Sequence, residues 1–323
     1  MRDTTTDILK SRISEGILAF PATPFRDDDG AIDQARFAGH ITDLVAARPT
    51  AIVPAGGAGE IFSLNQSEQE VLVRIATEHA GDIPVIAGVG QGLMIAIEMA
   101  RAAERAGAAA ILLFPPYLIT PDQDGLRAYA EQVCRAVAIG VIVYSRDNGV
   151  LTPDSVLRLA DRCPNLVALK DGTGDFESLV TLKHRAGDRL ALINGVPTAE
   201  TIAPQCFAIG IRSYTSAIFS FLPTLASRFY KAVSEGDDAL VDLVLERLVV
   251  PLVAIRRRRR GYAVAIVKAG LELVGKPMGP VRPPLISLSS TDRDDLAALI
   301  ERAGDLVGDL ATSAPGRAAR AAG

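Results

Sequence analysis

The sequence predicts an α/β fold, a (β/α)8 TIM barrel with an appended C-terminal helical subdomain. Short apolar runs alternate eight times with longer amphipathic segments between residues 16 and 235. The runs are apolar at nearly every position, as is typical of a parallel sheet covered on both faces. Eight consecutive βα units favour a closed barrel over an open doubly wound sheet. The GxGxxG motif of dinucleotide-binding folds does not follow the first run, which also argues against the open sheet.

The apolar runs are the expected strands, at residues 16–21, 51–55, 84–89, 109–114, 140–144, 166–170, 190–194 and 208–214. The helices that follow them are expected at residues 33–47, 67–80, 93–106, 125–137, 152–162, 175–186, 198–206 and 221–234. Ser67 and Glu70 have the spacing of a capping box at the start of the second helix. Gly107 is expected to end the third helix, and Pro153 suits the first turn of the fifth.

The pattern divides the chain into an N-terminal extension, the barrel as catalytic domain, the helical subdomain and a flexible tail, at residues 1–15, 16–235, 236–305 and 306–323. The helices of the subdomain are expected at residues 238–255, 262–274 and 293–303. The tail is rich in Ala, Arg and Gly, a composition that favours fraying at a chain end.

Composition and charge limit the classes of function. The 323 residues are 49% hydrophobic and 22% charged, with a net charge of −4, which favours neither a nucleic-acid nor a membrane partner. No apolar stretch reaches the ~18 residues of a membrane span, and residues 1–10 lack the apolar core of a signal peptide. Three scattered cysteines, Cys134, Cys163 and Cys206, fit buried thiols in a reducing compartment. A cytoplasmic location is therefore expected.

Lys170 is the residue with the clearest chemical implication. It ends an apolar run and is followed at once by the glycine-rich turn 171–175. Burial at a strand end disfavours the ammonium and lowers the pKa of a lysine toward neutrality. The neutral amine is the nucleophile that forms a Schiff base with a carbonyl substrate. The alternative is a lysine that reaches solvent from the end of its strand.

Barrel enzymes place their chemistry at the C-terminal ends of the strands, so these ends supply further candidates. Gly56, Gly57 and Ala58 follow the second strand, where backbone N–H groups can approach a carboxylate closely. A tight βα turn is the alternative explanation of these glycines. Tyr144 ends the fifth strand, next to the strand of Lys170, and its phenol can transfer protons during imine chemistry. The alternative for Tyr144 is a buried tyrosine with a satisfied hydroxyl.

Other conspicuous residues are expected to be structural. His40, His79 and His184 fall on predicted helices away from the barrel mouth and lack the spacing of a metal site, so no metal is expected. Five consecutive arginines at 256–260 end a predicted helix, where positive charge suits the helix dipole. A solvated face or a subunit contact is favoured there over a polyanion site.

With these residues in view, the chain resembles the dihydrodipicolinate synthase and N-acetylneuraminate lyase superfamily of Schiff-base-forming barrels, from about residue 16 to residue 303. The GxxGE element at 56–60, the tyrosine that ends the fifth strand and the lysine that ends the sixth occur in the order of that family. The resemblance implies that Lys170 forms the imine, that Tyr144 relays protons, and that Gly57 and Ala58 lie in a carboxylate-binding loop. It implies no cofactor. It also suggests a homotetramer, a dimer of dimers, in which Tyr117 serves a neighbouring subunit's site.

Four stretches, at 54–57, 144–148, 169–175 and 261–270, resemble the decarboxylating sugar-acid dehydratases within that superfamily. This narrower resemblance implies a small-molecule keto sugar diacid as substrate: 5-dehydro-4-deoxyglucarate would lose water and CO2 and give 2,5-dioxopentanoate. The other expected substrate ligands are Asn148, Asn194, Gly195, Thr215 and Ser216. Threonine is common at position 58 in this branch, and its hydroxyl could relay protons or bind the carboxylate. Because Ala58 lacks that hydroxyl, the role would fall to backbone N–H groups, Ser216 or water.

The synthase branch usually has two threonines where this chain has Gly57 and Ala58, and an arginine near Asn148, so synthase activity is not expected. Two alternatives remain open. One is a 2-keto-3-deoxy sugar-acid aldolase or lyase of the same superfamily, which would release pyruvate. The other is a non-catalytic keto-acid sensor, against which the Lys170–Tyr144 pair weighs and which Ala58 slightly favours.

Overall fold

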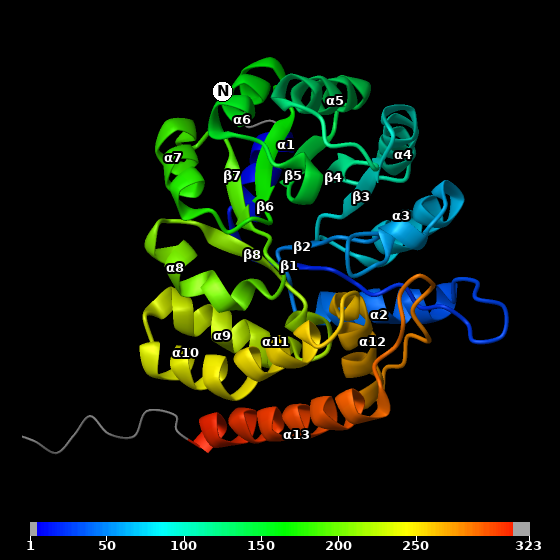
Figure 1. Ribbon diagram of the computed structural model, residues 1–323, viewed down its shortest axis with the longest axis vertical. Coiled ribbons are helices and arrows are strands. Elements are labelled where there is room, and N and C mark those ends of the chain that lie inside the picture. The colour runs from blue at the N-terminus through cyan, green and yellow to red at the C-terminus, as the bar shows by residue number, and fades with distance from the viewer. Residues whose placement is uncertain (1–4, 313–323) are drawn as a thin grey trace, which may run out of the picture.

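The computed structural model describes residues 5–312, with side chains through residue 304, and is built around eight parallel strands (Figure 1). The strands are β1 (Glu15–Ala19), β2 (Ala51–Ile52), β3 (Ile86–Gln91), β4 (Ala110–Pro116), β5 (Gly140–Ser145), β6 (Leu166–Asp171), β7 (Ala191–Asn194) and β8 (Arg212–Ser216). Strands that follow each other in sequence are paired, apart from β2 and β3, and β1 pairs with β8. A parallel bridge between Ile52 and Val85 links β2 to β3 and closes the ring. The predicted TIM barrel is confirmed.

Helices surround the strands. The main helix after each strand is, in order, α2 (Gln34–Ala46), α3 (Gln66–His79), α4 (Leu93–Arg105), α5 (Gln123–Ala136), α6 (Pro153–Arg162), α7 (Phe176–Ala186), α8 (Ala203–Ala208) and α9 (Pro223–Glu235). Short 3-10 turns follow several strand ends: η1 (Ile61–Ser63), η2 (Asp147–Gly149), η3 (Ala199–Ile202) and η4 (Ile218–Ser220). No helix in residues 5–312 combines the length and the apolar character needed to span a bilayer.

The barrel interior is filled by alternate residues of the strands, as the two-residue period of a strand requires. Leu18, Leu112, Ile142 and Ile193 belong to one buried cluster together with the small side chain of Ala168. The residues between them belong to separate clusters that include the surrounding helices. The interior is therefore a packed core, which leaves the ends of the strands as the place for a site.

The N-terminal extension contains a helix, α1 (Thr5–Ile13), that the sequence analysis did not predict. Leu9 and Ile13 are buried and belong to the interior cluster of the barrel. Their spacing of four residues places them on one face of the helix, and α1 covers the N-terminal end of the barrel, behind β6 and β7 in Figure 1. Three apolar residues in a short polar segment, one of them the exposed Ile8, are too few for a periodicity argument.

Helix α3 is capped differently from the prediction. Asn65 is its N-cap, and Asn65 and Glu68 form the capping box with both reciprocal hydrogen bonds, in place of Ser67 and Glu70. Asparagine caps a helix as well as serine does. Because the two pairs have the same spacing, the capping-box motif alone could not show which pair begins the helix.

Two predicted strands have different bounds in the structure. The apolar stretch at 208 ends α8 instead of starting β8, and Gly210, with φ +79°, turns the chain before β8 begins at Arg212. Periodicity cannot separate a buried helix from a buried strand over so few residues. β2 is shorter than predicted, and Ala55 adopts a left-handed φ of +50° in the turn that leaves it.

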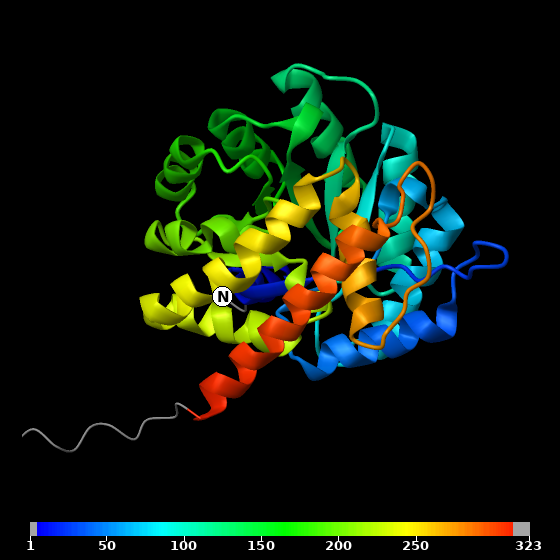
Figure 2. The same ribbon diagram turned by 60° about the horizontal axis from the view of Figure 1, so that its bottom comes forward.

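The C-terminal helices pack beside α9 and β8. α10 (Asp238–Val244), the π-helical turn η5 (Leu245–Val249) and α11 (Val250–Arg257) follow one another where the sequence predicted one helix. Pro251 has no N–H for the carbonyl four residues earlier, and the wider turn lies just before it. Figure 2 shows α13 (Ser290–Thr312) crossing α11 and α12 (Tyr262–Leu273). Residues 306–312 continue α13, and the rest of the predicted tail lies outside the described residues.

A buried ion pair joins the loop after β2 to helix α12. The carboxylate of Glu60 lies 2.8 Å from Nζ of Lys268, and the two side chains are 0% and 4% exposed. Glu60 also accepts the backbone N–H of Arg282 at 3.0 Å, and Lys268 donates to the carbonyl of Pro280 at 2.7 Å. Both charges are thus satisfied away from water, and the loop that carries Ala58 is held against the C-terminal helices.

We predict that Lys268→Met lowers the free energy of unfolding by about 3–5 kcal/mol, because it leaves the Glu60 carboxylate buried without its partner. The double variant Glu60→Gln/Lys268→Met is expected to recover most of that loss. Lys276→Met is the control, because the Lys276–Asp43 pair is about half exposed on both sides and should contribute about 1 kcal/mol or less. Urea unfolding measures all three, and equal losses for the two single variants would contradict the prediction.

Candidate active site

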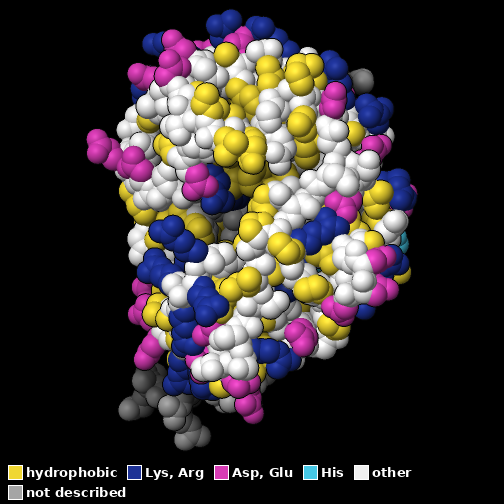
Figure 3. Space-filling model, turned by 45° about the vertical axis from the view of Figure 1, so that its right-hand side comes forward, with side chains coloured by type: hydrophobic (Ala, Val, Ile, Leu, Met, Phe, Trp, Pro, Cys, Tyr) yellow, Lys and Arg dark blue, Asp and Glu magenta, His cyan; other side chains and the backbone are white. Residues whose placement is uncertain are grey.

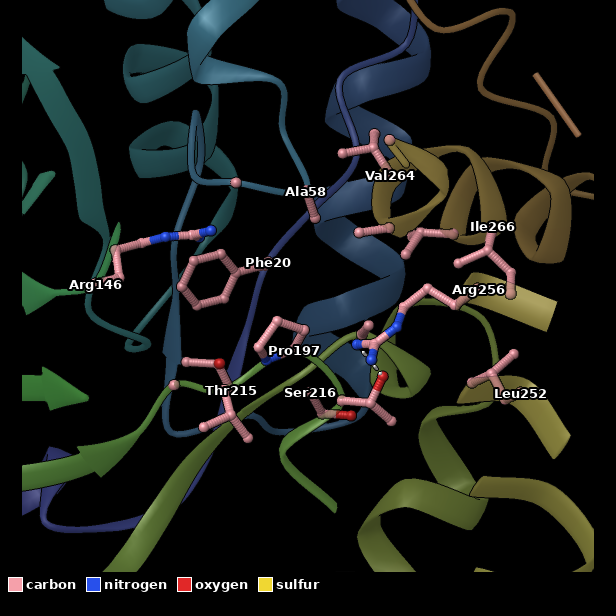
Figure 4. Close-up of a pocket in the computed structure, with 18 of the residues that line it drawn as sticks. Phe20, Ala58, Arg146, Pro197, Thr215, Ser216, Leu252, Arg256, Val264 and Ile266 are labelled. Atoms are coloured by element: carbon pink, nitrogen blue, oxygen red, sulfur yellow. Dashed lines mark hydrogen bonds between the residues drawn. The ribbon is translucent and has the colours of Figure 1, made fainter. Parts of the chain in front are cut away.

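A cavity of about 270 Å³ opens at the C-terminal ends of the strands, where helices α11 and α12 meet the barrel (Figure 4). Its polar lining includes Tyr144, Arg146, Lys170, Thr198, Thr215, Ser216 and Arg256. Its apolar lining includes Phe20, Phe62, Val196, Phe221, Leu252, Val264, Ile266, Val267 and Leu285. The strand ends thus supply most of the polar groups, and the C-terminal helices supply an apolar wall and one arginine.

Lys170 faces this cavity because of a β-bulge in β6. Val141 pairs with Leu166 and Ile142 pairs with Ala168, so β6 holds one extra residue at this point. A shift of one residue turns every later side chain to the other face of a strand. Leu166, before the bulge, packs in the cluster outside the barrel, whereas Ala168 belongs to the interior cluster and Lys170 follows two residues later.

The amine of Lys170 is buried beside an aromatic ring. The residue is 3% exposed, and its Nζ lies 3.3 Å from the centroid of the Tyr144 ring and donates to the carbonyl of Gly195 at 3.2 Å. Burial, and then the positive charge of Arg146, hold the pKa of Lys170 well below its ordinary value. The carboxylate of Asp171 opposes this shift without reversing it. The lowered pKa favours the neutral, nucleophilic form of the amine.

Gly195 is required by the position of the lysine. A Cβ at this residue would lie 2.5 Å from Cγ and 2.6 Å from Nζ of Lys170, far inside van der Waals contact. The carbonyl of Gly195 also accepts the hydroxyl of Tyr144 at 2.7 Å. One backbone carbonyl therefore holds both predicted catalytic side chains together, a role that the strand-end position alone did not reveal.

Tyr144 and Arg146 form the other side of this group. Tyr144 is the direct neighbour of Lys170 in the pairing of β5 with β6, and its hydroxyl accepts a 3.3 Å hydrogen bond from Nη1 of Arg146. Burial raises the pKa of Tyr144, and Arg146 opposes this by favouring the phenolate. Arg146 was not among the predicted site residues, although it lies two residues after Tyr144 and so on the same face of the chain.

The glycine loop after β2 meets the cavity at Gly57 and Ala58, whereas Gly56 is packed behind them. A Cβ at Gly56 would lie 2.5 Å from the ring of Phe20, and a Cβ at Gly57 would meet no atom within 4 Å. Figure 4 shows Ala58 near Val264 of α12, above the ring of Phe20. Open space at Gly57 leaves backbone groups accessible to a ligand, in keeping with a carboxylate-binding loop.

Thr215 and Ser216 line the cavity at the end of β8. Ser216 donates to the carboxyl group of Glu200 and accepts the N–H of Phe219 at 2.9 Å. Glu200 is 1% exposed, and burial raises its pKa to about 7. Glu200 was not predicted as a site residue, because a glutamate on a predicted helix normally faces water.

The two predicted asparagines lie outside the cavity lining, and so does Tyr117. Nδ2 of Asn148 donates to the carbonyls of Pro116 and Ile119 at 2.8 and 2.5 Å. Asn194 is buried, donates to the carbonyl of Ala199 at 3.0 Å and accepts the N–H of Val196. Both amides therefore hold loops in place. Tyr117 is 63% exposed on the loop after β4.

The five arginines at 256–260 lie in different environments. Arg257, Arg259 and Arg260 are exposed, and Arg258 is bonded to Asp292 at 2.7 Å and to Asp295 at 2.6 Å. Arg256 instead lines the cavity and donates to Oγ1 of Thr198 at 2.9 Å (Figure 4). Arg256 therefore does not belong to a solvated face, which was one of the two expectations for the run.

The histidines lie away from the cavity. His40 is buried in α2, where burial lowers its pKa to about 4.

The three cysteines are buried free thiols. Within the described part of the chain, no three His, Cys, Asp or Glu side chains are placed to hold a metal ion.

A protein family and several known proteins are similar to this chain in sequence and structure. The model of the Dihydrodipicolinate synthetase family matches residues 13–303. The chain belongs to this family. Its solved relatives include dihydrodipicolinate synthase from Oceanobacillus iheyensis, with a TM-score of 0.86 and 26% identity over 93% of this chain and 99% of that one. Another is the prophage protein YagE from E. coli K12 in complex with pyruvate, with a TM-score of 0.80 and 25% identity over 89% and 98% of the two chains.

Sequences nearer to this chain bear a narrower name. A protein of Rhizobium rhizogenes named probable 5-dehydro-4-deoxyglucarate dehydratase is 46% identical, over 91% of this chain and 97% of its own length. A protein of Methylobacterium radiotolerans with the same name is 48% identical, over 89% and 95%. The family resemblance drawn from the glycine loop, Tyr144 and Lys170 is therefore confirmed.

We predict that Gly195→Ala lowers the rate of imine formation with pyruvate by about 100-fold, because the new methyl group displaces the Lys170 amine. Borohydride reduction followed by mass spectrometry of the Lys170 peptide measures this rate. Gly39→Ala is the control, because Gly39 lies in α2 with no atom near its missing Cβ. An unchanged rate in Gly195→Ala would contradict the steric argument.

We predict that Glu200→Gln changes the pH dependence of stability. The folded protein favours the protonated form of Glu200. The contribution of Glu200 to the free energy of unfolding is therefore fully present below the unfolded pKa near 4.5 and is lost as pH rises through about 7. Between pH 4.5 and 8 the wild type should lose about 3 kcal/mol relative to Glu200→Gln. Urea unfolding at several pH values measures the difference, and parallel curves for the two proteins would contradict it.

Proposed function

We propose that this protein is a Schiff-base-forming lyase that converts 5-dehydro-4-deoxyglucarate into 2,5-dioxopentanoate, CO2 and water. The observation that carries the proposal is the buried amine of Lys170, with its lowered pKa, beside the ring of Tyr144. The substrate is taken from the relatives that are 46–48% identical over about nine-tenths of the chain. A cavity of about 270 Å³ suits a ligand of this size.

The first step is attack of the Lys170 amine on the keto group next to one carboxylate. The carbinolamine that forms loses water, and the Tyr144 hydroxyl is placed to carry the protons because it lies on the strand beside the amine. Backbone N–H groups at Gly57 and Ala58 would hold the adjacent carboxylate. YagE, solved with the 2-keto acid pyruvate, supports a keto acid as the ligand of this fold.

The protonated imine then acts as an electron sink. It acidifies the neighbouring CH2 group, from which Tyr144, or a water that it orients, removes a proton. The hydroxyl on the next carbon leaves as water, with the proton that balances its charge, and a conjugated iminium remains. Arg146 stabilises negative charge on the phenol oxygen during this transfer, because its guanidinium donates to that oxygen.

Decarboxylation follows along the same conjugated system. The bond to the distal carboxylate breaks, CO2 leaves, and the electron pair moves toward the iminium nitrogen. Protonation on carbon and hydrolysis of the imine then release 2,5-dioxopentanoate and restore Lys170. These steps require no electron acceptor and no added cofactor, because every electron pair returns to a carbon–hydrogen or carbon–oxygen bond.

We also propose that the protein acts in the cytoplasm as a homo-oligomer, a tetramer in line with its family resemblance. An interface is supported by exposed apolar side chains in the loop after β4 and at the start of α4, namely Tyr117, Leu118, Ile119, Met94 and Ile95. Figure 3 shows hydrophobic side chains gathered on the upper part of one face of the molecule. Tyr117 would reach a neighbouring subunit's site from this loop.

We predict that Lys170→Ala abolishes both CO2 release and borohydride trapping, and that Tyr144→Phe lowers turnover by roughly 10²- to 10⁴-fold through loss of the acid–base group. Turnover of 5-dehydro-4-deoxyglucarate is followed by CO2 and by mass spectrometry of the product. Activity in Lys170→Ala would refute the mechanism. Pyruvate as product would instead identify an aldolase, and trapping without turnover would identify a sensor.

A further inference from the structure

Arg256 is a charged residue in the cavity that the proposed chemistry has not used. It lies in the last turn of α11, outside the barrel strands. In Figure 4 its guanidinium points back toward Pro197 and Ser216, across the cavity from Arg146. The four arginines that follow it do not line the cavity, so its orientation is particular to this position in the run.

The guanidinium of Arg256 has unused hydrogen-bonding capacity. It carries five N–H donors. Among the described residues, the one side chain to which it donates a hydrogen bond is that of Thr198, at 2.9 Å. No carboxylate in residues 5–304 forms an ion pair with it, whereas Arg146 is paired with Asp147 at 2.6 Å. The buried carboxyl group of Glu200 acts on Arg256 electrostatically without forming a salt bridge with it. Arg256 is therefore the arginine of the cavity with N–H donors left for an anion.

The surroundings of Arg256 favour the binding of an anion. Leu252 and Ile266 line the cavity on the same side as Arg256 (Figure 4). Burial lowers the pKa of Arg256, which means that its charge is poorly solvated there. A carboxylate in this place would receive charge-assisted hydrogen bonds and would replace the hydration that the guanidinium has lost.

Arg256 lies across the cavity from Arg146 in Figure 4. Arg146 donates to the hydroxyl of Tyr144, whose ring lies beside the Lys170 amine. Thr215 and Ser216 line the cavity and lie between Arg146 and Arg256 in Figure 4, lower in the view than both. The order amine, hydroxyls, guanidinium matches a chain with a keto group near one end, hydroxyls in the middle and a carboxylate at the other end.

We propose that Arg256 binds the substrate carboxylate farthest from the keto group, and that this contact selects 2-keto diacids over 2-keto monoacids of the same length. The inference rests on the proposed Schiff-base function. It also gives a reason for product release, because this carboxylate departs as CO2 and leaves an aldehyde that cannot form the ion pair.

The test uses two matched probes, 2-oxohexanedioate and 2-oxohexanoate, which differ only in the distal carboxylate. Borohydride trapping at Lys170 over a range of concentrations gives the half-saturating concentration of each. The wild type should prefer the diacid by about 10- to 100-fold, as for a hydrogen-bonded charge pair. Arg256→Met should remove this preference and leave the trapping of 2-oxohexanoate unchanged.

Two further variants separate the contact from general effects. Arg257→Met removes the same charge from the next, exposed residue and should keep the preference. Arg256→Gln keeps a donor for Thr198 without the charge and should lose the preference, which covers the case in which Arg256→Met does not fold.

Each outcome decides between the two proposals. A preference retained in both Arg256 variants, or an equal loss for both probes, would overturn the role of Arg256 and leave the Schiff-base function intact. Equal trapping of the two probes by the wild type would do the same. Failure of the wild type to trap either keto acid would overturn the Schiff-base function itself, and the role of Arg256 with it.

Discussion

The Lys170 amine is held out of water at the mouth of the barrel, and the rest of the site is arranged around this constraint. An ammonium there would lose most of its hydration, and the neighbouring Asp171 carboxylate already accepts hydrogen bonds from Thr173 and Gly174 in the turn after β6. The missing side chain of Gly195 leaves room for the amine, and its carbonyl orients it. The lowered pKa of the amine is thus a consequence of packing.

The C-terminal helices are part of this site as well as an addition to the barrel. Helix α12 supplies apolar wall residues such as Val264 and anchors the glycine loop through the buried Glu60–Lys268 pair. Helix α11 supplies Arg256. A barrel alone would leave the strand ends open to solvent, and water would weaken each electrostatic contact within the cavity.

Sequence reasoning was most successful where one residue implies one chemistry. Lys170 and Tyr144 were predicted from their places at strand ends, and the structure brings them together at adjacent positions in the sheet. It was least successful for polar residues with several common roles. Glu200 and Arg256 belong to helical segments on which charged side chains usually face water, and only packing shows that Glu200 is buried and that Arg256 enters the cavity.

The sequence by itself determined the number and order of the βα units, because apolar runs and capping residues are local signals. It also determined that a lysine and a tyrosine end neighbouring strands. Only the tertiary structure decided which way Lys170 points, because the bulge between Leu166 and Ala168 reverses the inward and outward faces of β6. That reversal depends on pairing with β5, a contact between distant parts of the chain that no local pattern records.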